Sequence, residues 1–199
     1  MKNISLSQEV KTIVRGMVSN AAKFKLEVLT TFLLFDSMMS QKQFSSLIAK
    51  YSSCNLEGII NLIENIYKNN PFGFNEKEVE TIEERDYFIS VLKDSDIDNP
   101  QNFIFSQWIA NVFFFAYILV ESDEEQELTL SHLTLALFNN LNDQMLSFFT
   151  DIGTNIEQLI SQVEYLSLLD SCIEDDSALV IPDSCLLYTS PSPRDTERS

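Results

Sequence analysis

Apolar residues recur along the chain with the spacing of an α-helix, and one such series occurs twice. The first series lies at positions 6, 10, 13, 14, 17, 18 and 21, and the second at 105, 109, 112, 113, 116, 117 and 120. Both advance by the same steps, which place the side chains on one face of a helix. Ser7 and Ser106 precede these helices as expected N-caps. The pattern predicts a duplicated helical unit with an offset of 99 residues.

Three further helices are predicted in each copy. Residues 55–57 match 155–157 at an offset of 100, and we align 32–34 with 132–134, so one residue is expected to be inserted in a loop. Asn55 and Asn155 are the expected N-caps of the last helix in each copy. The predicted helices cover 6–23, 28–40, 42–51 and 55–68, then 105–121, 129–140, 142–150 and 155–169.

The predicted fold class is all-α, because no segment alternates as a strand does. Two four-helix repeats, related by a pseudo-twofold axis, are expected to pack as one domain over 1–170. Repeat 1 covers about 5–68 and repeat 2 about 104–170, and a long acidic linker over 69–103 joins them. Apolar residues within the linker predict a short helix over 78–93. A further acidic linker is expected over 171–184.

The charge of the chain is strongly negative and uneven. The net charge is −17, and residues 101–170 contain ten acidic residues and no Lys or Arg. Such a surface repels nucleic acid and anionic membranes, so neither is expected as a partner. The acidic side chains either attract a partner protein or simply keep the surface solvated. The chain lacks a signal peptide and an apolar run long enough to cross a bilayer, which favours a cytoplasmic location.

Residues for catalysis or cofactor binding are scarce. The four glycines never take the spacing of a dinucleotide or phosphate loop, which indicates that the chain binds no nucleotide. One histidine and three cysteines without a C-x-x-C pair do not favour a zinc site. His132 lies on an apolar helix face, where a packed, hydrogen-bonded role is expected. We therefore expect no cofactor, no metal and no enzymatic activity.

The double repeat resembles the N-terminal Clp repeat domain of the Clp family of AAA+ protein unfoldases. In that family the second helix carries Thr-x-Glu-His-Leu-Leu-x-Ala-Leu-Leu, of which this chain keeps His132, Leu133, Ala136 and Leu137. The first copy departs further from the motif. The acidic connection at 83–86 resembles the inter-repeat link of the ClpA branch. All of these motifs occur in the family's order, over residues 5–169.

The resemblance implies a non-catalytic domain that recognises substrates or adaptors for a Clp ATP-dependent unfoldase or protease. Its partners would be adaptor proteins or unfolded proteins, and the Clp peptidase would be reached indirectly, through AAA+ modules expected downstream. Two alternatives are a free-standing Clp-repeat accessory protein that docks on a Clp complex, and an unrelated helical scaffold. Residues 185–199 resemble a translated adapter sequence and are left out of the fold interpretation.

Two groups of residues are predicted to bind the partner. For adaptor docking we select Thr31, aligned with the motif glutamate, together with Glu83, Glu84, Arg85 and Asp86. An exposed charged linker without a partner is the alternative for the last four. For an apolar groove we select Phe72, Phe74 and Trp108. Trp108 replaces Glu9 of the first copy on a face that should meet water.

Overall fold

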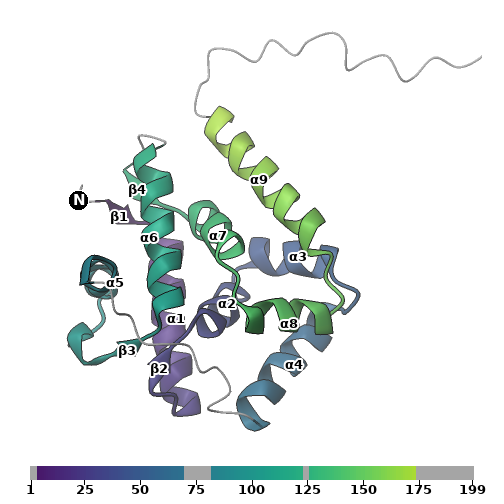
Figure 1. The fold of residues 1–199 in the computed structure, drawn as a ribbon, viewed down its shortest axis with the longest axis horizontal. Coiled ribbons are helices and arrows are strands. Elements are labelled where there is room, and N and C mark those ends of the chain that lie inside the picture. The colour runs from purple at the N-terminus through teal and green to yellow at the C-terminus, as the bar shows by residue number, and fades with distance from the viewer. Residues whose placement is uncertain (1–3, 70–81, 123–125, 174–199) are drawn as a thin grey trace, which may run out of the picture.

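The computed structural model describes residues 4–69, 82–122 and 126–173, with side chains of the last range up to Tyr165. Within these ranges the chain is almost entirely helical, which confirms the all-α prediction (Figure 1). The elements are β1 (Ser5–Leu6), α1 (Gln8–Phe24), β2 (Val28–Leu29), α2 (Thr31–Met38), α3 (Lys42–Tyr51), α4 (Leu56–Asn69), α5 (Ile82–Asp94), the 3-10 helix η1 (Pro100–Asn102), β3 (Ile104–Phe105), α6 (Gln107–Ser122), β4 (Glu127–Leu128), α7 (Leu130–Asn139), α8 (Asp143–Asp151) and α9 (Ile156–Ile173).

The helix starts match the predicted N-caps. The Ser7 hydroxyl accepts a hydrogen bond from the Val10 amide at 3.3 Å, and the Ser106 hydroxyl accepts one from the Ile109 amide at 3.2 Å. Asn55 and Asn155 cap α4 and α9 in the same way. Each cap satisfies an amide that has no partner within its helix, so short polar residues fix where these helices begin.

Two short parallel strand pairs show the duplication directly. β1 pairs with β4, Ser5 lying opposite Glu127, and β2 pairs with β3, Val28 lying opposite Ile104. Each pair joins the strand before the first helix of one repeat to the strand before the second helix of the other. The offset between equivalent strands is 99 residues in both cases. The sequence analysis did not predict these strands, because two residues are too few to show alternation.

The register of α2 and α7 corrects one alignment. Thr30 and Thr129 are the N-caps of these helices, so the offset of 99 continues through them. Aligning 32–34 with 132–134, at an offset of 100, was therefore wrong by one residue. The caps of α3 and α8, Gln41 and Asn142, are 101 residues apart, so the change of offset begins after α2 and α7. The caps of α4 and α9, Asn55 and Asn155, are 100 residues apart.

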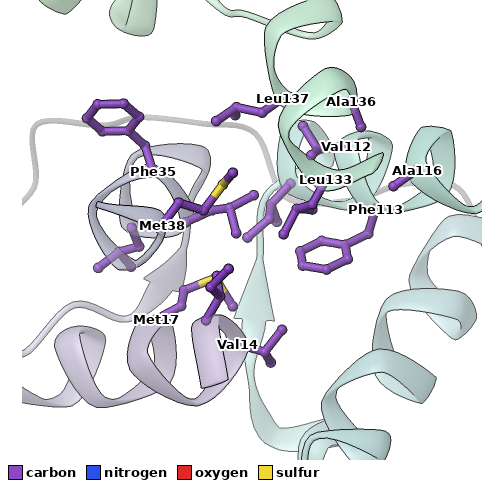
Figure 2. Close-up of a cluster of buried hydrophobic side chains, with 14 of the residues drawn as sticks. Val14, Met17, Phe35, Met38, Val112, Phe113, Ala116, Leu133, Ala136 and Leu137 are labelled. Atoms are coloured by element: carbon purple, nitrogen blue, oxygen red, sulfur yellow. The ribbon is translucent and has the colours of Figure 1, made fainter. Parts of the chain in front are cut away.

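The core lies where α1 and α2 of the first repeat meet α6 and α7 of the second (Figure 2). Val14 and Met17 of α1 are fully buried, as are Phe113 and Ala116, their equivalents in α6. The predicted apolar series is buried along both helices, apart from the half-buried Val18. Apolar side chains from both repeats share this core, so the two halves form one domain.

The loops before α4 and α9 lie against each other where α3 and α8 end, and backbone hydrogen bonds join them. The Asn155 amide donates to the Tyr51 carbonyl at 3.1 Å, and the Cys54 amide donates to the Ile152 carbonyl at 3.3 Å. Gly153, in the second loop, has a φ of +65°. A Cβ at Gly153 would lie 2.7 Å from the Ser53 Oγ, so this position requires glycine for its backbone conformation and for space.

Helix α5 covers the outer face of α6. The short helix predicted over 78–93 is observed over Ile82–Asp94, and residues 78–81 lie outside the described ranges. Its Tyr87 and Phe88 are buried against aromatic rings of α6, the Tyr87 and Tyr117 centroids lying 5.1 Å apart. Arg15 of α1 binds the Ser95 carbonyl and the Asp96 carboxylate just beyond α5. The linker helix is therefore part of the packed domain.

Candidate functional site

An apolar stripe runs along the exposed side of α6. It consists of Trp108, 39% exposed, Ile118, 44% exposed, and the half-buried Phe115 and Leu119. Their spacing places them on one helix face. The equivalent positions of α1, at an offset of 99, carry Glu9, Gly16, Ser19 and Asn20. The first repeat therefore presents a polar face where the second presents this α6 stripe.

The predicted acidic residues lie next to this helix. Glu83, Arg85 and Asp86 are exposed on the first turns of α5, and Glu84 is half-buried. The Glu84 carboxylate accepts a hydrogen bond from the Nε2 of Gln107, the residue before Trp108. Gln107 also donates to the Asn111 Oδ1 at 2.6 Å. The structure thus brings the charged start of α5 beside the N-terminal end of the α6 stripe.

Thr31 is not available to a partner. Its side chain is completely buried, and its Oγ1 accepts a hydrogen bond from the Asn142 Nδ2 at 3.1 Å. The offset of 99 places Thr31 opposite Leu130, whereas the alignment matched it with Ser131. Its selection as a docking residue was therefore wrong, because the alignment was shifted by one residue. Phe72 and Phe74 lie outside the described residues.

A second surface feature, which the sequence did not predict, is a pocket of about 90 Å³ where α3, α7 and α9 meet. Apolar side chains form most of its wall, and a serine, a threonine and a glutamine form the rest. A second hollow between α3 and α9 is lined by Tyr51 and by Glu157 of α9, among others. The residues that line the pocket are Gln43, Phe44 and Leu47 of α3, Leu130, Ser131 and Thr134 of α7, and Val163 of α9.

His132 has the structural role expected of it. It is 9% exposed, and its Nδ1 lies 2.7 Å from the Thr129 Oγ1 and accepts a hydrogen bond from the Thr129 amide. The Thr129 hydroxyl also accepts from the His132 amide, which completes a capping box at the start of α7. His132 therefore stabilises the start of α7, and its ring nitrogen Nδ1 takes part in that cap.

The perturbed ionisable groups are buried in the packing. Burial raises the pKa of Asp36 on α2, whose Oδ2 accepts a hydrogen bond from the Asn20 Nδ2 at 2.9 Å. Burial also raises the pKa of Tyr67, and the nearby Asp36 carboxylate adds to this increase. The pKa of Tyr87 on α5 is raised mainly by its burial against α6. These hydroxyls stay protonated, as expected of structural residues.

Within the described ranges, no group of three or more His, Cys, Asp or Glu side chains could hold a metal ion. No helix in the same ranges is long and apolar enough to cross a bilayer. The α6 stripe and the small pocket are both surface features suited to contacts with other polypeptides. The fold and surfaces together define an all-α double-repeat domain with two candidate docking surfaces.

Two solved structures that share this fold are the N-terminal domains of Hsp104 and of the chaperone ClpD. The N-terminal domain of Hsp104 from Candida albicans aligns with a TM-score of 0.58 at 11% identity, over 82% of this chain and 91% of that one. The N-terminal domain of the caseinolytic protease associated chaperone ClpD from Arabidopsis thaliana aligns with a TM-score of 0.58 at 13% identity, over 85% and 97%. No family profile and no curated protein matches the chain. The chain has the Clp N-domain fold.

Proposed function

We propose that this chain is a non-catalytic, protein-recognition domain of a Clp-type unfoldase. One observation carries the proposal: the second repeat exposes apolar side chains on α6 where the first repeat is polar. An exposed tryptophan and isoleucine on one helix face are costly to leave in water unless a partner covers them. The Clp N-domain fold of the neighbours supports this role.

The partner is an unfolded polypeptide segment with apolar and basic side chains. Its apolar side chains would cover Trp108, Phe115 and Ile118. Its basic side chains would contact Glu83 and Asp86, which are exposed on α5. The net charge of −17 would attract such a segment to the chain. An adaptor protein that presents such a segment would dock in the same way. This proposal places the domain in the cytoplasm, with the ATPase activity in AAA+ modules.

A matched pair of variants tests the proposal. Ile118→Asp puts a charge on the α6 stripe, and Ile60→Asp makes the same change on α4, where the isoleucine is also 44% exposed. The readout is the fluorescence anisotropy of a labelled, permanently unfolded polypeptide titrated with the full chain. Ile118→Asp is expected to weaken binding about tenfold or more, because a buried isoleucine contributes about 1.5–3 kcal/mol. Ile60→Asp should leave binding unchanged.

Two results would contradict the proposal. If both variants bind the polypeptide as the parent chain does, the α6 stripe is not the docking surface. If Ile60→Asp weakens binding as much as Ile118→Asp, the effect is one of stability or charge and not of position. The thermal unfolding temperatures of the two variants should agree. A difference between them would show that an effect on binding arises from stability.

A further inference from the structure

The pocket between α3, α7 and α9 has a pseudo-symmetric counterpart in the other half of the molecule. The N-caps Thr30 and Thr129 relate α2 to α7 at an offset of 99. The N-caps Gln41 and Asn142 relate α3 to α8 at an offset of 101. These offsets identify, for each residue that lines the pocket, the residue in the equivalent place of the other half.

The counterpart is filled by three phenylalanine rings. Phe148 of α8 lies edge-on against Phe32 and Phe35 of α2, with centroid distances of 5.3 Å to each. The interplanar angles of 77° and 66° are those of favourable aromatic pairs. Phe148 is only 3% exposed, so its ring closes this half of the molecule to solvent.

At the pocket the three equivalent positions carry smaller side chains. Leu47 replaces Phe148, Ser131 replaces Phe32, and Thr134 replaces Phe35. Phe44 and Val163 keep the remaining wall apolar. A volume of about 90 Å³ is therefore left open where the other half holds a ring. Much of the wall of this open pocket is apolar and meets water, which favours an apolar occupant.

The pocket is separate from the α6 stripe. Leu133, Ala136 and Leu137 of α7 face the core shared with α6 (Figure 2), whereas Ser131 and Thr134 of the same helix line the pocket toward α3 and α9. Figure 1 shows α7 between α6 and α9. The two surfaces can consequently be altered one at a time.

We propose that this pocket binds a single phenylalanine side chain of a basic partner segment, in the position that Phe148 takes in the other half. The charges around the pocket favour basic flanking residues. Glu157 of α9 lines the hollow between α3 and α9, and Glu164 follows Val163 on the same helix. Lys42 and Lys50 of α3 line neither the pocket nor this hollow, so basic side chains of the segment are expected along α9.

Three short peptides test the proposal with the full chain, labelled with ¹⁵N and followed by NMR. Acetyl-Lys-Phe-Lys-amide is expected to shift the amide signals of Leu47, Ser131 and Thr134. Acetyl-Lys-Ala-Lys-amide should bind about tenfold or more weakly, because it lacks the ring. Acetyl-Glu-Phe-Glu-amide should bind more weakly than the lysine peptide, and the difference should shrink as salt is added.

Variants connect binding to the pocket. Thr134→Phe restores the ring present at Phe35 and should reduce binding of the phenylalanine peptide at least tenfold, whereas Thr150→Phe, at an exposed position of α8, should not. If Thr134→Phe fails to fold, Leu47→Phe fills the pocket from the opposite wall. Trp108→Ala should leave the peptide-induced shifts of Leu47, Ser131 and Thr134 unchanged, because these amides report the pocket and not the α6 stripe, which separates this proposal from the proposed function.

Several outcomes would overturn the proposal. Equal affinity for the phenylalanine and alanine peptides would show that no ring is bound. Shifts confined to α6 would place the peptide elsewhere. Pocket signals that depend on protein concentration without peptide would identify a second copy of the chain as the occupant. Pocket signals that change when Leu179→Asp and Ile181→Asp are introduced would identify the chain's own tail.

Discussion

Single residues decide how closely the two repeats approach each other. Gly153 lies where the two loops cross, and its φ of +65° and its distance to Ser53 leave no room for a side chain. The role of Gly153 could not be predicted from the sequence, because the residue it contacts, Ser53, is 100 positions away. N-caps such as Ser7 and Asn155 could be predicted, since their partners lie three residues ahead.

Gly153→Ala is expected to lower the free energy of unfolding by about 1–3 kcal/mol, since it combines a disfavoured backbone conformation with a steric conflict. The measurement is urea denaturation. Gly16→Ala is the matched control, because its Cβ would lie an ordinary 3.4 Å from the Ser37 Oγ within a helix. That control should be neutral or stabilising by up to about 1 kcal/mol. Equal effects of the two changes would show that the loops do not cross closely.

At the scale of helices, the elements that pack against α1 and α6 explain why these two equivalent helices carry different side chains. In α6, Ala110, Phe114 and Tyr117 occupy positions that in α1 carry Lys11, Arg15 and Val18. Phe114 and Tyr117 lie against Tyr87 of α5, and the described part of the first repeat has no helix equivalent to α5. Helix periodicity predicted the elements and most of their bounds. It could not predict the pairing, which depends on residues far apart in the chain.

Phe88→Ala tests whether α5 belongs to the core. Phe88 is fully buried, with its ring 4.7 Å from that of Phe105 and 5.1 Å from that of Phe113. The substitution is expected to cost about 3–5 kcal/mol of unfolding free energy. Ile82→Ala, on the same helix at 74% exposure, should change stability by less than about 0.5 kcal/mol. A small effect of Phe88→Ala in urea denaturation would mean that α5 is only loosely attached.

At the scale of the whole molecule, function is inferred from departures from the pseudo-twofold symmetry. The fold of two matched halves could be predicted from the sequence, because the apolar series repeats. Trp108 could also be selected, because it stands where the first copy has Glu9. The selection of Thr31 was wrong because the alignment was shifted by one residue, and a shift of one residue assigns a side chain to another face of the helix. The pocket had no local signal, since three separate helices form it.

Trp108 also provides the most direct measurement of the central claim, because it is the only tryptophan in the chain. The experiment titrates the full chain with an unfolded polypeptide that contains no tryptophan, while anisotropy of a label on that polypeptide reports binding independently. The account predicts that the emission of Trp108 shifts to shorter wavelength in step with binding, as the partner covers the α6 stripe. Emission that stays constant while the polypeptide binds, or the absence of binding, would contradict it.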